Sequence, residues 1–386
     1  MIKKFALVLL FVAVSVCFLS VSNSVVKADD LSNNIEEQLN NLDLSELEEY
    51  INNISNQPAE FDFALNVRKL LNGEYDSSYL NFPQYVLNVL LDNIFSAMPT
   101  FLSILAIAIF CGIMQSIKSG FVSEGVSDMV FFVCFLSIIL LISSEVIAIW
   151  KTTQITIKNM AKLSEIMSPI ILTLMIASGG NVSASVYKPA VAFLSNGVLN
   201  VIMTIVLPLI GVMSIFAIIS HFSQSVKLTK FSELATSIIK WIMGLIIAIF
   251  GLFLSVQGIT SATFDGISIK AAKYALSNSV PIIGGFLGSG FDLMIAGSVL
   301  IKNAIGVVSI VGLLYLILSP VLYMVAFSLL LKLTAAVTEP ITDQRLSNFC
   351  ATVSKCITYM IVCVIIVGFM LFITVLLMIF SANAFI

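Results

Sequence analysis

The chain has 386 residues, of which 59% are hydrophobic and 11% are charged, and its formal net charge is −3 at pH 7. Soluble globular proteins carry about 25% charged residues, and their cores do not require apolar runs of about 20 residues. Such runs recur in this chain, and a run of that length crosses a bilayer as a helix, because its backbone polar groups must be satisfied internally. The composition therefore excludes an ordinary soluble protein and predicts an all-α, polytopic membrane protein.

Residues 1–28 have the pattern of a secretory signal peptide. Two lysines supply a positive start, residues 5–19 form an apolar core, and Val26 and Ala28 are the small residues of a cleavage site. We expect cleavage after Ala28. An uncleaved anchor helix is the alternative.

An acidic segment follows. Residues 29–97 contain 13 Asp and Glu but only two basic residues, a net charge of −11, whereas residues 98–386 contain 9 acidic and 14 basic residues. Leu44, Leu47 and Ile51 repeat at the spacing of one helix face. We predict a small helical head outside the cytoplasm, which serves either as a solvated spacer or as a docking surface for a partner.

The membrane body contains seven or eight apolar elements, depending on how short runs are counted. Residues 98–150 supply two full spans. Residues 166–178 and 281–300 are short or glycine-rich runs, and the basic stretches at 151–165 and around Lys270 are interpreted as loops before them.

Prolines in the body recur at a spacing of 112 residues. The sequences around them share an order: a basic loop, a proline, a long span, a polar loop and a second span. This order predicts a two-fold repeat, with one copy at 151–262 and the other at 263–386. Prolines that merely punctuate apolar helices are the alternative. The paired prolines are Pro169 with Pro281 and Pro208 with Pro320.

The polar residues form no catalytic constellation. The chain has one histidine, and the metalloprotease, P-loop, EF-hand, nucleophile-elbow and C-x-x-C patterns are absent. Five cysteines remain after the signal segment, an odd number that argues against a disulfide framework or a zinc site. We expect no enzyme activity, no cofactor, no metal and no nucleic-acid ligand.

Ionisable residues within apolar segments are candidate functional residues, because a charge is costly there. Glu145 has a simpler explanation, since it lies near Trp150 and can reach the interface. Lys302 and Asn303 lie between two apolar stretches and are interpreted as the loop that joins two spans. Asp292 follows a glycine cluster, so we predict a broken segment that lines water around it. The candidate pathway residues are Asp292, Lys302, Asn303, Pro281, Gly284, Gly288 and Glu145.

A stripe of small residues recurs along the span that begins near residue 238. Small residues at this spacing let helix backbones approach closely. We expect the stripe to pack this helix within the protein, and contact between protomers is the less favoured use. Its members are Gly244, Ala248, Gly251, Ser255 and Gly258.

The most specific sequence signature lies between residues 230 and 345. Together with the order of signal peptide, acidic head and polytopic body, it resembles the stage III sporulation protein AE family of endospore-forming bacteria. The motifs carry no known chemistry, so they indicate a family and not a mechanism. They are Ser255-Val256-Gln257-Gly258, Thr260-Ser261-Ala262, Asp265-Gly266, Ala272-Lys273, Pro281, Gly284, Asp292, Ser298, Leu300, Lys302-Asn303, Gly306 and Glu339-Pro340.

The resemblance implies a role that composition does not show. Members of the family are expected in the mother-cell membrane around the forespore, in a secretion-like channel complex encoded by the same operon and needed after engulfment. The expected partners are the membrane and the other subunits of that complex, with the oligomeric state left open. A stand-alone small-molecule or ion transporter is the alternative.

Overall fold

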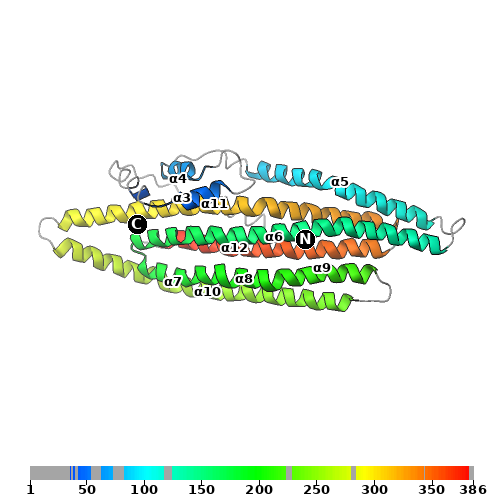
Figure 1. Ribbon diagram of the computed structural model, residues 1–386. Helices are drawn as coiled ribbons and strands as arrows, with labels where there is room; N and C mark the ends of the chain where they lie inside the picture. The colour runs from blue at the N-terminus through cyan, green and yellow to red at the C-terminus, as the bar shows by residue number, and fades with distance from the viewer. Residues whose placement is uncertain are drawn as a thin grey trace.

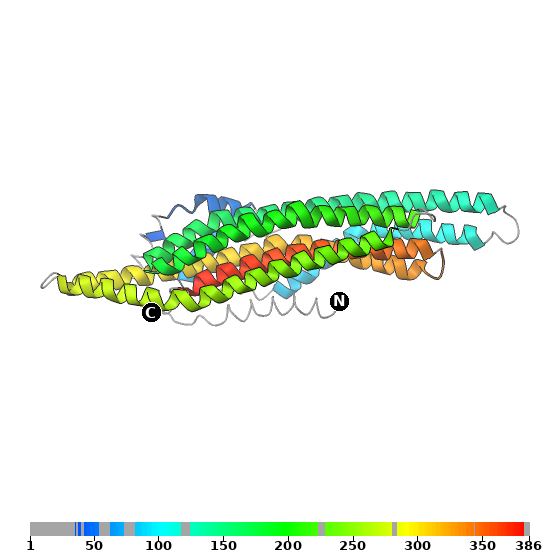
Figure 2. The same ribbon diagram turned by 90° about the horizontal axis from the view of Figure 1, so that it is seen from below.

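Long α-helices, several of them more than 35 residues, lie side by side in the computed structural model (Figure 1, Figure 2). The structure describes residues 35, 38–39, 42–53, 62–72, 82–116, 124–222, 228–279, 284–342 and 344–381. The α-helices are α3 (Ser45–Asn52), α4 (Phe63–Leu71), α5 (Phe82–Ser116), α6 (Glu124–Ala177), α7 (Asn181–Ala192), α8 (Leu199–Val201), α9 (Leu207–Phe222), α10 (Thr229–Ser279), α11 (Gly284–Thr338) and α12 (Gln344–Phe380), with the π-helical turns η3 (Phe193–Val198) and η4 (Ile202–Val206).

Six helices in the described part of the chain are long and apolar enough to cross a membrane. The all-α, polytopic class is therefore confirmed. The signal segment with Ala28, and the repeat proline Pro281, lie outside the described residues.

The described part of the chain has six candidate spans, where the sequence predicted seven or eight apolar elements. Residues 166–178 mainly form the end of α6, and the described part of 281–300 forms the start of α11. The basic stretch 151–165 is also helical, within α6, so its interpretation as a loop is wrong.

The reason for this error lies in the spacing of the lysines. Lys151, Lys158 and Lys162 recur after seven and four residues, a spacing that places them on one face of a helix. Their charges lower the average hydropathy of the stretch, but they do not interrupt the helix. The same holds for Lys270, which lies within α10.

The repeat stays a prediction. Its boundaries, after residues 150 and 262, lie inside α6 and α10. Pro320 is interior to α11, whereas Pro208 is the second residue of α9 and follows η4. A proline removes a backbone donor and excludes the carbonyl four residues before it, and a π-helical turn accommodates such a break in the ladder.

Helices α11 and α12 form the centre of the bundle. In each, 61% of the most apolar window is buried, against 22% to 39% in the other four spans. α11 contacts α5, α6, α10 and α12, and α12 also contacts α9. A Cβ added at Gly306 or Gly368 would collide with Ile379 or Ile317 of the opposite helix, so these glycines permit the close approach of α11 and α12.

The longest helices exceed the thickness of a bilayer. α6 has 54 residues and α11 has 55, about 80 Å each at 1.5 Å per residue, against a hydrocarbon core of about 30 Å.

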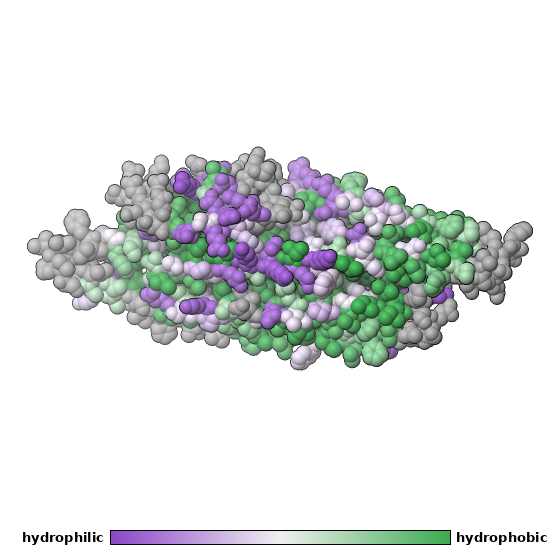
Figure 3. Space-filling view, viewed as in Figure 1, coloured by the Kyte–Doolittle hydropathy of each residue, from purple (hydrophilic) through white to green (hydrophobic). Residues whose placement is uncertain are grey.

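The ends of α5, α9 and α11 and the starts of α6, α10 and α12 lie together at one end of the molecule, on the right in Figure 1. Hydrophobic side chains cover this end, and hydrophilic side chains gather over α3, α4 and the neighbouring part of α6 (Figure 3).

Helix α6 changes its surface along its length, and we name two segments accordingly. The apolar segment of α6, residues 129–150, exposes six large hydrophobic side chains and contains one charged residue, Glu145. The polar segment of α6, residues 151–177, exposes two large hydrophobic side chains and contains four charged residues. The exposed hydrophobic residues are Met129, Phe132, Val133, Leu136, Leu140 and Ile147 in the first segment and Ile155 and Ile176 in the second.

Candidate functional site

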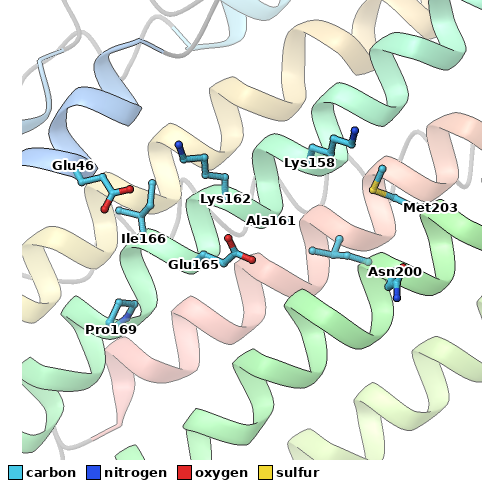
Figure 4. A pocket seen from close by; sticks show the side chains of 10 residues that line it. Glu46, Lys158, Ala161, Lys162, Glu165, Ile166, Pro169, Asn200 and Met203 are labelled. Carbon is cyan, nitrogen blue, oxygen red and sulfur yellow. The ribbon is translucent and has the colours of Figure 1, made fainter.

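A groove of about 560 Å³ lies between the polar segment of α6, the α8 region and α3 (Figure 4). Lys158, Lys162 and Glu165 line one side, because a spacing of four and three residues places them on one face of α6. Asn200 and Met203 line the other side, next to the π-helical turns. π-helical turns often occur at functional sites, so this mixed-charge groove is the best candidate for a binding surface in the polar part of the molecule.

The acidic head packs beside this groove. The Tyr50 hydroxyl donates a hydrogen bond of 2.8 Å to the carbonyl of Asn159, and the Lys162 ammonium lies 5.5 Å from the centre of the Tyr50 ring. Burial raises the pKa of Tyr50 to about 12, so the phenol remains protonated and remains a donor at neutral pH. Leu47 and Ile51, on the predicted helix face, are fully buried, which confirms that face. Glu46 of the same helix lines the groove.

Asp265 is a buried carboxylate that sequence reasoning did not select as a site residue. It is fully buried on α10, and it accepts hydrogen bonds from the backbone amides of Val182 (2.9 Å) and Ser183 (3.2 Å) and from the Ser183 hydroxyl. These amides belong to the first turn of α7, where unpaired donors and the helix dipole favour a negative charge. Asp265 therefore ties α10 to the turn between α6 and α7.

The turn itself requires a glycine. Gly179 has a φ of 86°, in the left-handed region that favours glycine, and a Cβ there would collide with Ile269 of α10. The α6–α7 turn is thus fitted closely against α10, four residues from Asp265.

Lys302 is a buried cation near a helix C-terminus, whereas Asp265 is a buried anion at a helix N-terminus. Lys302 lies inside α11 with no exposed surface, and its ammonium donates to the carbonyl of Ser381, just after the end of α12. A helix C-terminus has unpaired carbonyls and favours a positive charge. The loop interpretation of Lys302 and Asn303 is therefore wrong, because both lie within a continuous helix. Lys302 joins the end of α12 to α11.

Asp292 pairs with Lys273 of α10 and not with Lys302, the other candidate charge of α11. Its carboxylate lies 2.6 Å from the Lys273 ammonium of α10, and both side chains are about half exposed. α11 is helical from Gly284 onward and includes Gly288, so the described part of this segment is not a broken helix as predicted. Asp292 and Lys302 are not partners, and each is bonded to another helix.

Glu145 is also bonded within the protein. The Tyr323 hydroxyl of α11 donates a 3.0 Å hydrogen bond to its carboxylate, and the Thr100 hydroxyl of α5 lies 3.5 Å away. Glu145 thus links three helices inside the apolar part of the bundle. Among the described candidates, Glu145, Asp292 and Lys302 each bond to a different partner.

Similarity to known proteins identifies the family of this chain. A family model described as Stage III sporulation protein AE matches residues 61–382. The chain belongs to the stage III sporulation protein AE family. A relative of that name from Bacillus subtilis (strain 168) is 28% identical over 282 residues, which cover 73% of this chain and 70% of the relative. No solved structure matches the chain. Family membership and six apolar helices together make this a sporulation membrane protein.

One packing prediction for this family member is wrong. Gly244, Ala248, Gly251 and Ser255 are exposed on α10, and a Cβ added at Gly244 or Gly251 would meet nothing within 4 Å. The small-residue stripe therefore does not pack α10 against the rest of the chain at these positions. The surroundings of the Gly258 side-chain position lie outside what the structure describes.

Sequence reasoning missed Asp265 although a signal was present. Asp265-Gly266 belongs to the motif that carried the family resemblance. Its partners lie 82 and 83 residues earlier in the chain, so no local spacing reveals them. An acidic residue in an otherwise uncharged stretch was the available clue. No group of metal-ligating side chains is found among the residues described.

Proposed function

We propose that this protein is a non-enzymatic integral membrane subunit of the mother-cell-to-forespore sporulation complex, needed for forespore development after engulfment. The observation that carries the proposal is the family match over residues 61–382. The six apolar helices supply the membrane body. The groove, with its charged side chains beside the acidic head, supplies a surface on which another subunit can dock.

The proposed orientation puts the head outside the mother-cell cytoplasm. The six candidate spans of the described residues leave α3 and the end of α12 on the same side, and both lie away from the right-hand end of the bundle in Figure 1. Basic residues lie at both ends, Arg345 beside the turn between α11 and α12 and Lys158 and Lys162 beside the head, so the positive-inside tendency favours neither orientation. The predicted signal peptide is consistent with this orientation.

A conduit, on this proposal, forms between subunits. Side chains of α11 and α12 fill the centre of the bundle along most of its length. The ionisable candidates Glu145, Asp292 and Lys302 are each bonded to a neighbouring helix. This arrangement favours a scaffold or wall of a larger channel over a stand-alone transporter with its own pathway.

Deletion and crosslinking test the proposal. Deleting the gene should block sporulation after engulfment and leave vegetative growth unchanged, and the intact chain should restore sporulation. A photo-crosslinking residue at Lys158 should capture another protein encoded in the same operon, whereas one at Leu140, on the apolar segment of the same helix, should not. A defect in growth or uptake of vegetative cells, without loss of sporulation, would instead indicate a transporter.

A further inference from the structure

A second cavity, of about 630 Å³, lies between α9, α11, α12 and the start of α10. Its walls bring together Lys332 of α11, Lys355 of α12 and His221 of α9. The described residues that line it include no Asp or Glu. Three helices therefore contribute basic side chains to one cavity.

The remaining polar lining includes three groups that can donate hydrogen bonds to an anion. They are the hydroxyls of Ser220 and Ser232 and the side-chain amide of Asn348, from α9, α10 and α12. Phosphate oxygens accept bonds from both ammonium and hydroxyl groups. The hydroxyls of Thr352 and Thr358 also line the cavity, but they already donate to the carbonyls of Asn348 and Ser354.

The cavity lies near the hydrophobic end of the bundle. Lys332 is six residues before the end of α11, and Lys355 is eleven residues after the start of α12, about 9 Å and about 16 Å along the helices from the turn. Lysines at this depth extend their ammonium groups toward the headgroup level. The first part of α10 exposes Phe231, Leu234 and Trp241, and Phe231 contacts Phe216 in the cavity wall. Exposed aromatic residues such as Phe231 and Trp241 are typical of the membrane interface.

We propose that this cavity binds the phosphate of an anionic phospholipid. Lys332 and Lys355 bind the phosphate oxygens, the Ser220 and Ser232 hydroxyls complete the hydrogen bonds, and the acyl chains lie along the exposed apolar side chains of α10. Basic pockets between transmembrane helices recognise anionic headgroups in this way. A free phosphate ion would use the same polar groups but would gain nothing from the apolar surface, so we assign the site to the lipid.

Thermal unfolding of the purified full-length protein in detergent, with and without added lipid, tests this proposal. Dioleoylphosphatidylglycerol should raise the midpoint of unfolding more than dioleoylphosphatidylcholine. The Lys332→Gln, Lys355→Gln double variant should bind the anionic lipid about 30-fold more weakly, because both ammonium contacts to the phosphate are lost.

Lys240→Gln is the matched control. Lys240 is an exposed lysine eleven residues after the start of α10, as Lys355 is eleven residues after the start of α12, but it does not line the cavity. The Lys240→Gln variant should bind the anionic lipid as tightly as the unchanged protein does. The Lys332→Arg, Lys355→Arg variant retains both charges and should keep most of the affinity, which separates lost charge from damaged folding.

Three results would overturn the proposal. They are equal stabilisation by the two lipids, an equal loss of affinity in Lys240→Gln, and stabilisation by inorganic phosphate alone equal to that by the anionic lipid. The last result would indicate a site for a small soluble anion.

Discussion

The apolar and polar segments of α6 belong to one continuous helix, yet they present different surfaces. Residues 129–150 expose large hydrophobic side chains, whereas residues 151–177 carry lysines, contact the head and form a wall of the groove. The comparison teaches that the end of an apolar run does not mark the end of a helix, and we expect α6 to leave the membrane near residue 150. The backbone hydrogen bonds continue because a helix satisfies them in water as well as in lipid.

The largest expected effect comes from placing a charge on each segment. Leu140→Arg should impair membrane insertion, because Leu140 is 63% exposed on the apolar segment and a charge in the bilayer centre costs about 3 kcal/mol on insertion scales. Ile155→Arg should have little effect, since Ile155 is 57% exposed on the polar segment of the same helix. The amount of protein integrated into membranes, after an alkaline wash, measures both variants. Equal loss in the two would break the comparison.

An intermediate effect is expected where α10 is tied to the end of the polar segment. Asp265→Ala should lower the free energy of unfolding by about 2 kcal/mol, because three hydrogen bonds to a buried carboxylate are lost and the first turn of α7 loses its cap. Asp292→Ala removes a half-exposed ion pair and should cost less than about 1 kcal/mol. Denaturant unfolding in detergent compares them, and a larger cost for Asp292→Ala would contradict the structural role of Asp265.

The smallest expected effect concerns the head. Tyr50→Phe removes the hydrogen bond to Asn159, worth about 1 kcal/mol, and should speed amide hydrogen exchange in α3 about fivefold. Tyr274→Phe, at an exposed position on α10, is the control and should leave that exchange unchanged. Unchanged exchange in Tyr50→Phe would mean that the head does not depend on this contact with the polar segment.

The sequence predicted those features that depend on local pattern. The membrane class followed from the apolar runs, and the buried face of α3 followed from the spacing of Leu47 and Ile51. Residues 151–165 were misread because their charges lie on one face of a helix, and averaging hydropathy over the stretch hides that face.

Contacts between distant parts of the chain could not be predicted. Asp265 bonds to residues more than 80 positions away, and Lys302 to the end of α12, 79 positions away. Asp292 and Lys302 looked like a functional unit because both are charges within apolar sequence. Each is explained by a partner on another helix, and local sequence does not specify such a partner.

The most direct test of the account is a spin-label scan along α6, from residue 129 to residue 177, in the lipid-reconstituted protein. Accessibility to oxygen, which concentrates in the bilayer, and to a water-soluble nickel reagent is measured at each position. The account predicts a helical period of 3.6 residues throughout, with outward positions accessible to oxygen up to about residue 150 and to the nickel reagent from residue 151 onward. Loss of the helical period between 151 and 165, or oxygen-accessible positions through the whole of that stretch, would contradict a single helix that leaves the membrane there.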